Sequence, residues 1–211
     1  MLSAEDQLRA CFAVGDPARF DFRRKPREGV IVRTNPRRAV VQTSHDIFHI
    51  PYERLLPNPD LADRRMRRIR EVHQQAVDVL QLHGLKAWRF RFDHSTRRAG
   101  CCSYHDRSIS ISIDLAVHGS EADIRDTILH ETAHALVGSK HGHDRIWKAK
   151  AIEIGGTGTR THRTEFSVPR WKVRCENACW QHTAQRRSYR LVCRQCGGRL
   201  VYSPITHADG F

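Results

Sequence analysis

The sequence predicts an α+β fold in three parts, and three observations support this prediction. Residues 1–58 contain short apolar runs separated by turn residues, a pattern typical of a small β-barrel-like module. Residues 59–165 combine helical periodicities with strand-like runs, which predicts one compact mixed domain. Residues 166–211 contain two pairs of closely spaced cysteines, which predicts a small metal-binding ribbon.

The composition restricts the class of protein and of partner. The formal net charge of +13 favours a polyanionic partner such as nucleic acid, with a basic but merely solvated surface as the alternative. No apolar run approaches the ~20 residues of a membrane span, so we expect a cytoplasmic protein without a membrane partner. In that reducing compartment the seven cysteines indicate metal ligands or buried thiols rather than disulfides.

The first module is expected to consist of strands of four to six residues joined tightly into a small antiparallel barrel. Turn residues in the segment KPREG predict a turn at 25–29. Barrels of this kind bind nucleic acid or peptides in some proteins and only dock in others, and the sequence leaves both open. The strand-like runs lie at 19–22, 30–33, 39–43 and 47–50.

The mixed domain is predicted to begin with a long helix over 61–83, because apolar side chains recur there at steps of three and four residues. Its arginines between 64 and 70 form either a solvated face or a phosphate-binding edge. Strand-like runs follow at 87–92, 100–104 and 108–113.

In the last of these runs isoleucines alternate with serines, which predicts a sheet with one buried face. Cys101 and Cys102 are interpreted as structural residues of this sheet, because no other cysteine lies close to them in sequence.

A second helix is predicted from Ser120 to Gly138, with Ser120 and Asp123 in the pattern of a capping box. This helix contains the sequence His-Glu-Thr-Ala-His at 130–134. The helix is therefore the candidate carrier of a metal site.

The two histidines of this motif, His130 and His134, are separated by just over one helical turn. Their imidazoles project from the same side and can share one tetrahedral metal ion. Glu131 lies about 100° around the helix. It can accept a proton from a water beside the metal without occupying a coordination position, an arrangement typical of zinc hydrolases.

A catalytic zinc site needs a third protein ligand, and three residues are candidates. We favour His143, because a helix that begins there would place it on a buried stripe with Trp147 and Ala151. His141 precedes that helix, and Glu153 falls off the stripe. Both remain alternatives.

The motif and its surroundings resemble the SprT-like zinc metalloproteases, the Spartan-related family. This resemblance implies a compact gluzincin-like metalloprotease domain with zinc on His130, His134 and His143 and with Glu131 as the general base. It also implies a protein substrate crosslinked to DNA. Asp144 replaces a proline of the family pattern. The matching segments are the helix of 61–83, Trp88-Arg89-Phe90, Arg98-Ala99-Gly100, the strand of 109–113, and residues 127–136 and 142–149.

The C-terminal cysteines are spaced for a structural zinc ribbon, which would lack enough core to fold without metal. Cys175 and Cys179 form the first pair and Cys193 and Cys196 the second, with 13 residues between the pairs. The three-residue gap in the first pair departs from the usual two, so His182 is an alternative ligand to Cys179.

Basic and aromatic residues are interleaved around these cysteines, which favours binding to DNA with single-stranded character. Arg174, Arg186 and Arg187 are the candidate DNA-binding residues. The alternative is that the aromatic residues form the small core of the ribbon itself. The aromatic residues are Trp171, Trp180, Tyr189 and Tyr202.

These observations and the family resemblance together predict a zinc metalloendopeptidase with one catalytic and one structural zinc ion; the resemblance implies that it acts on DNA-associated or DNA-crosslinked proteins in DNA repair. One alternative is a DNA-binding zinc protein with a non-catalytic site on the helix. Glu131 argues against it, because a structural site has no use for a carboxylate beside the metal. Another is a zinc hydrolase with a non-peptide substrate. The oligomeric state stays open.

Overall fold

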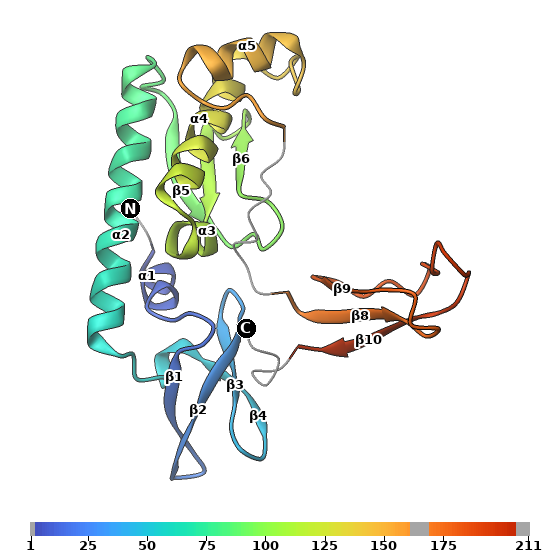
Figure 1. The fold of residues 1–211 in the computed structure, drawn as a ribbon. Coiled ribbons are helices and arrows are strands. Elements are labelled where there is room, and N and C mark those ends of the chain that lie inside the picture. Colours follow the sequence, from blue (N-terminus) through green and yellow to red (C-terminus); the bar gives the residue numbers. More distant parts are fainter. Residues whose placement is uncertain (1–2, 161–168, 206–211) are drawn as a thin grey trace. The chain divides into compact units, whose positions relative to one another are not determined.

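The computed structural model describes residues 3–160 and 169–205, and the chain divides into two compact units. The first unit comprises Met1–Cys11 and Pro57–Ser167, and the second comprises Phe12–Leu56 and Val168–Phe211 (Figure 1). Helices and strands are mixed along the chain, which confirms the predicted α+β class. Within the described ranges, no helix has the length and apolar character needed to cross a membrane.

Within the described residues, the first unit contains five α-helices and a small sheet. The long helix predicted over 61–83 is present as α2, with Asn58 as its N-cap and Pro59 in its first turn. Most of its buried side chains, among them Ile69 and Ala76, belong to one apolar core with residues of the sheet and of three other helices. The helices are α1 (Ala4–Ala10), α2 (Pro59–Leu82), α3 (Ile113–His118), α4 (Glu121–Val137) and α5 (Arg145–Glu153).

Two arginines of α2 have structural partners in this unit. The Arg65 guanidinium donates a hydrogen bond of 2.9 Å to the backbone carbonyl of Cys11. The Arg68 guanidinium donates to the carbonyls of Ala116, at 2.9 Å, and of Gly119. These two side chains therefore satisfy carbonyl groups near helix ends, a role that the sequence analysis did not foresee.

The sheet of the first unit contains β5 (Arg89–Asp93), β6 (Gly100–Ser103) and β7 (Ser108–Ser112), in the order β5-β7-β6. β7 is parallel to β5 and antiparallel to β6. All five residues of β7 are buried, so the prediction of only one buried face is wrong. On the second face two of the buried serines are hydrogen-bonded: the hydroxyl of Ser110 donates to Asp93 and that of Ser112 donates to the carbonyl of Ser95.

Helix α1 packs in this same unit. Arg9 of α1 is buried and donates a hydrogen bond of 2.7 Å to the carboxylate of Asp114, and Ala10 belongs to the apolar core. The segment that was grouped with the barrel in the module of residues 1–58 thus contains a helix that contacts α2 and α3 residues of the domain.

The second unit begins with a four-stranded antiparallel half-barrel in the order β1-β2-β3-β4. Its core contains Phe20, Ile31 and Val41, each less than 5% exposed. The strands are β1 (Pro17–Phe22), β2 (Lys25–Thr34), β3 (Arg38–Gln42) and β4 (Ile47–Pro51), and a short 3-10 helix follows at Tyr52–Arg54.

The turn expected at residues 25–29 is misplaced. The chain reverses instead at Arg23 and Arg24, and the KPREG segment lies in β2 opposite β1. Pro26 is tolerated there because this part of β2 pairs with β1 alone, whereas the β3 pairing begins at Val30.

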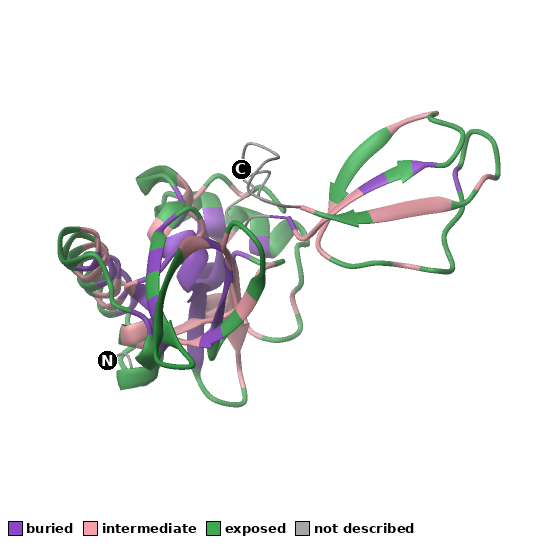
Figure 2. Cartoon of the chain, turned by 90° about the horizontal axis from the view of Figure 1, so that it is seen from below, coloured by how far each residue is buried: buried purple, intermediate pink, exposed green. Residues whose placement is uncertain are grey.

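The cysteine-containing segment forms a three-stranded antiparallel sheet in the order β10-β8-β9. Its strands are β8 (Trp171–Cys175), β9 (Gln181–Ala184) and β10 (Leu200–Pro204). Most of its surface is exposed or half-buried (Figure 2). Within residues 169–205 the buried ones are Pro169, Val173, Cys175 and Cys193.

Candidate metal centres and active site

Helix α4 carries the first candidate site, and its start follows from local sequence. The Ser120 hydroxyl accepts a hydrogen bond from the Asp123 N–H at 3.1 Å and donates one to the Asp123 carboxylate at 2.6 Å. The predicted cap at Ser120 is therefore confirmed. The helix ends at Gly138, which has a φ of 87° and can adopt this left-handed backbone because it lacks a Cβ.

Three histidines converge beside this helix. The Nε2 atom of His143 lies 3.0 Å from Nε2 of His130 and 3.2 Å from Nε2 of His134. In a tetrahedral site with Zn–N bonds of about 2.0–2.1 Å, two ligand nitrogens would be about 3.3 Å apart. The three imidazoles thus have the spacing that one zinc ion requires.

The protonation of these imidazoles also suits a metal. Burial and the neighbouring His143 lower the pKa of His134 to about 4, although a hydrogen bond to the backbone of His141 acts in the opposite direction. Burial and Arg160 lower the pKa of His143 as well. Both imidazoles are therefore neutral near pH 7, and a neutral nitrogen has a lone pair that can bind a metal.

His143 reaches this group from a different position than the sequence analysis expected. α5 begins at Arg145, with Asp144 as its N-cap, so His143 precedes the helix and is exposed rather than lying on a buried stripe. The Asp144 carboxylate accepts hydrogen bonds from the N–H groups of Ile146 and Trp147, at 3.0 and 2.9 Å. The cap therefore fixes the backbone that presents His143.

The two alternative third ligands contact other residues. His141 Nδ1 lies 2.8 Å from the Asp144 carboxylate, and Glu153 pairs with Lys150 at 2.6 Å. Neither is part of the group of converging ligand atoms, which contains His130, His134 and His143 within 4.8 Å of one another.

Trp147 of α5 forms an apolar support for all three imidazoles. Its ring centroid lies 4.6 Å from those of His130 and His143, and its ring stacks on His134 at 5.2 Å. The side chain is 1% exposed, so the indole excludes water from that side of the site. The sequence pattern placed Trp147 on one stripe with His143 but gave no sign of its contacts with His130 and His134.

Glu131 is 7% exposed and packs against the edge strand β6. A Cβ on Gly100 would lie 2.8 Å from the Glu131 Oε1 atom, so the absence of a side chain at Gly100 makes room for the carboxylate. Burial raises the pKa of Glu131 to about 8, while Arg98 and a hydrogen bond from the Cys102 backbone N–H act to lower that pKa.

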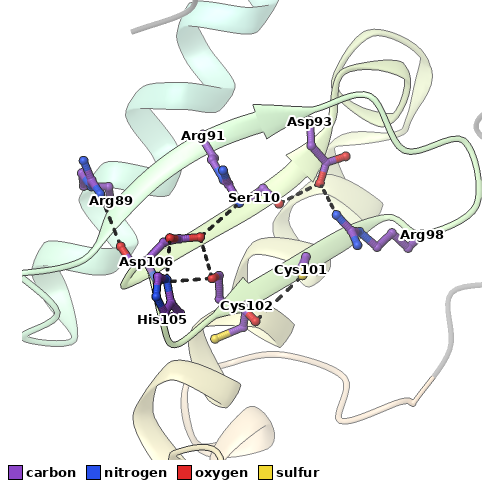
Figure 3. Close-up of polar contacts among 10 residues, drawn as sticks. Arg89, Arg91, Asp93, Arg98, Cys101, Cys102, His105, Asp106 and Ser110 are labelled. Atoms are coloured by element: carbon purple, nitrogen blue, oxygen red, sulfur yellow. Dashed lines mark hydrogen bonds and ion pairs between the residues drawn. The ribbon is translucent and has the colours of Figure 1, made fainter. Parts of the chain in front are cut away.

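The Arg98 guanidinium is held near Glu131 by Asp93. Arg98 donates to the Asp93 carboxylate at 3.1 Å, and the same oxygen accepts from the Ser110 hydroxyl at 2.7 Å (Figure 3). Arg98 entered the sequence prediction only as part of a family resemblance, and no sequence pattern singled out Asp93. No spacing rule could have found them, because β5, the following loop and β7 meet only in the folded sheet.

The four cysteines form the second candidate metal centre. Cys175, Cys179, Cys193 and Cys196 bring their Sγ atoms within 4.8 Å of one another, and Cys175 and Cys196 are 3.4 Å apart. The longer gap in the first pair is accommodated by Ala178 with a φ of 56°. His182 is not in this group.

The surroundings of the cysteines favour thiolates at part of the site. The Asn177 side chain and the Gly198 N–H donate to Cys196 and lower its pKa to about 6. The thiol of Cys179 hydrogen-bonds Cys196 and is partly buried, which raises its pKa to about 12. A divalent cation among the four sulfurs would favour the thiolate form of each.

The three candidate DNA-binding arginines are exposed on this small sheet and its loop. The Arg187 guanidinium lies over the Trp171 ring, 4.4 Å from its centroid, and 5.6 Å from the Tyr189 centroid. Tyr189 is 82% exposed, whereas Trp171, Trp180 and Tyr202 are half-buried. Arg174 lies in β8 and Arg186 in the loop after β9.

One family profile matches the part of the chain that contains the first candidate site. The SprT-like family profile matches residues 67–170. Protein SprT of Pseudomonas savastanoi pv. phaseolicola is 26% identical over 165 residues, which cover 71% of this chain and 100% of that protein. Protein SprT of Shigella dysenteriae serotype 1 is 29% identical over 153 residues, covering 64% and 90%.

A human relative is similar over a shorter part. The germ cell nuclear acidic protein of Homo sapiens is 28% identical over 133 residues, which cover 54% of this chain and 19% of the human protein. No solved structure matches the chain.

Proposed function

From the premise that residues 67–170 belong to the SprT-like family, we propose that this protein is a zinc metalloendopeptidase that acts on DNA-associated or DNA-crosslinked proteins. The observation that carries the proposal is the convergence of three imidazole nitrogens beside helix α4, which also bears the buried Glu131. A purely structural site would not need this carboxylate.

In this proposal His130, His134 and His143 hold a catalytic zinc ion, and the four cysteines hold a structural one. When bound, the catalytic zinc supplies a Lewis acid that polarises the peptide carbonyl and makes a water nucleophilic near neutral pH. Trp147 keeps one side of the imidazoles dry, and Asp144 fixes the backbone before α5.

Glu131 serves as the general base of the proposed reaction. Its carboxylate accepts a proton from the attacking water and later donates that proton to the leaving amine. The Cys102 N–H and the Arg98 guanidinium stabilise the ionised form of Glu131 against the cost of burial. A cation bound by the histidines would lower this raised pKa of Glu131 towards the range in which the carboxylate can act as a base.

The proposed association with DNA rests on charge and on the ribbon surface. Residues 169–205 contain eight basic residues and a single acidic one, Glu176, and Tyr189 exposes a ring on which an unpaired base could stack. The name of the human relative, which calls that protein nuclear, agrees with a role near DNA.

The third ligand is tested by comparing two neighbouring histidines. His143→Ala is expected to remove one of two zinc equivalents and to lower proteolysis by at least about 100-fold, because two imidazoles hold zinc far less firmly than three. His141→Ala is the matched control and should retain both metals, since His141 contacts Asp144 instead. Elemental analysis and digestion of a casein substrate measure both effects. Equal metal loss from the two variants would contradict the assignment.

Cleavage of a DNA-binding protein is expected to be faster when single-stranded DNA is present, because DNA recruits enzyme and substrate together. If the ribbon makes about four phosphate contacts, log affinity should fall with log salt at a slope near −3. Replacing Arg174, Arg186 and Arg187 with Ala should bring that slope to about −1.

A small peptide without affinity for DNA is the control substrate, and its cleavage should not change in the triple variant. An unchanged salt slope would show that the ribbon is not the DNA-binding surface. Equal digestion with and without DNA would contradict the coupling of DNA binding to proteolysis.

A further inference from the structure

The hairpin between β1 and β2 is closed by two arginines in an unusual backbone conformation. Arg23 has a φ of 52° and Arg24 a φ of 61°, and they are the two central residues of the turn. A two-residue hairpin turn with positive φ at both positions is normally Asn-Gly, because side chains with a Cβ are strained there. Strained backbone conformations of this kind are found more often at functional sites, so this turn is a candidate site.

This hairpin extends beyond the rest of its sheet. β1 pairs with residues 25–30 of β2, whereas β3 pairs only from Val30 onward. Every residue from Asp21 to Glu28 is exposed, so the segment is a two-stranded ribbon whose end is open to solvent (Figure 1). An isolated two-stranded hairpin has little stability by itself, and strained residues at its tip lower that stability further.

The hairpin concentrates positive charge at its tip. Residues 19–28 contain five basic and two acidic side chains. Glu28 is paired with Arg19 at 3.0 Å, near the base of the β1–β2 hairpin. The basic side chains at the tip of the hairpin face solvent. The Arg23 guanidinium lies 5.4 Å from the Phe22 ring centroid, an interaction that restricts its motion before any ligand binds.

We propose that the β1–β2 hairpin is a second nucleic-acid-binding element, in which Arg23 and Arg24 contact phosphates of duplex DNA. Guanidinium groups bind phosphate oxygens in a bidentate manner, and an exposed two-stranded ribbon has the width that a major groove admits. The inference extends the DNA association proposed above to the half-barrel, a module for which neither the family profile nor the zinc chemistry gives a role.

The test uses a substitution that should separate binding from folding. Arg23→Asn with Arg24→Gly installs the preferred turn residues, so Tm should stay the same or rise. Affinity for a duplex oligonucleotide, measured by fluorescence anisotropy with the full zinc-loaded chain, should fall about tenfold or more. The salt slope should become less steep by about 2 because two phosphate contacts are lost.

Arg37→Gln with Arg38→Gln is the matched control, since it removes two exposed charges from the same half-barrel at another turn. Its affinity loss should be smaller than threefold. Equal losses of duplex affinity in the two double variants would mean that binding depends on the overall positive charge of the half-barrel, and this would overturn the proposal. A greater loss for single-stranded than for duplex DNA would overturn the duplex assignment.

Two further variants complete the test. Lys25→Gln with Arg27→Gln removes charge from the β1–β2 hairpin while keeping Arg23 and Arg24, the two central residues of the turn. It should also weaken duplex binding. Unchanged affinity in this variant and in the Asn-Gly variant would overturn the proposal. The affinity loss caused by Arg23→Asn with Arg24→Gly should also be seen when Arg174, Arg186 and Arg187 are replaced with Ala. This comparison separates the contribution of the hairpin to DNA binding from that of the C-terminal zinc ribbon.

Discussion

Glu131→Gln is expected to lower peptide-bond hydrolysis by about 10²–10⁴-fold while the protein keeps both metals. Gln has nearly the same size and leaves the three imidazoles in place, but it cannot accept the proton of the attacking water. Digestion of casein and elemental analysis on the same preparation measure the two quantities. Retained activity would show that the base lies elsewhere.

The same substitution should change how stability depends on pH. In the metal-free protein, burial raises the pKa of Glu131 from 4.5 to about 8. Between these values the unfolded chain releases a proton that the folded chain keeps. The free energy of unfolding therefore falls by about 1.4 kcal/mol per pH unit as pH rises.

Below pH 4.5 the ionisation of Glu131 does not lower the free energy of unfolding, and above about pH 8 the decrease is complete. Glu131→Gln removes the titration, so the chelated variant should become more stable than the chelated wild type at alkaline pH. Urea unfolding from pH 5 to 9 measures the difference. Parallel pH curves for the two proteins would contradict the buried, protonated carboxyl.

The second large effect is expected from Cys193→Ser combined with Cys196→Ser. This variant should lose one of two zinc equivalents and unfold residues 169–205, because structural zinc contributes on the order of 10 kcal/mol or more to small domains. Four buried residues cannot replace that contribution. Elemental analysis and limited proteolysis of the C-terminal segment report the two losses.

Cys11→Ser is the matched control, since Cys11 lies outside both ligand groups and its thiol contacts the carbonyl of Gln7. It should keep both metals. The double variant should also retain its histidine-bound zinc and its cleavage of a small peptide. Joint loss of both metals would contradict the separation of the chain into a catalytic and a structural site.

The local elements of both sites could be predicted from the sequence. A spacing of four residues on a capped helix places His130 and His134 on one side, whatever the rest of the fold does. The paired cysteines and the Gly197 turn, with a φ of 72°, likewise belong to short segments whose geometry is decided by neighbouring residues. Periodicity also located α2 and α4 to within a few residues.

What the tertiary structure decided depends on residues far apart in the chain. Asp144 engages His141 and caps α5, which leaves His143 to meet the other two imidazoles, and no periodicity encodes that choice. The environment of Glu131 is made by Gly100, Arg98 and Cys102, because the edge strand β6 lies against α4 only after folding. Pairing between strands also moved the first turn of the half-barrel to Arg23 and Arg24, where strand register outweighed the preference of side chains for negative φ.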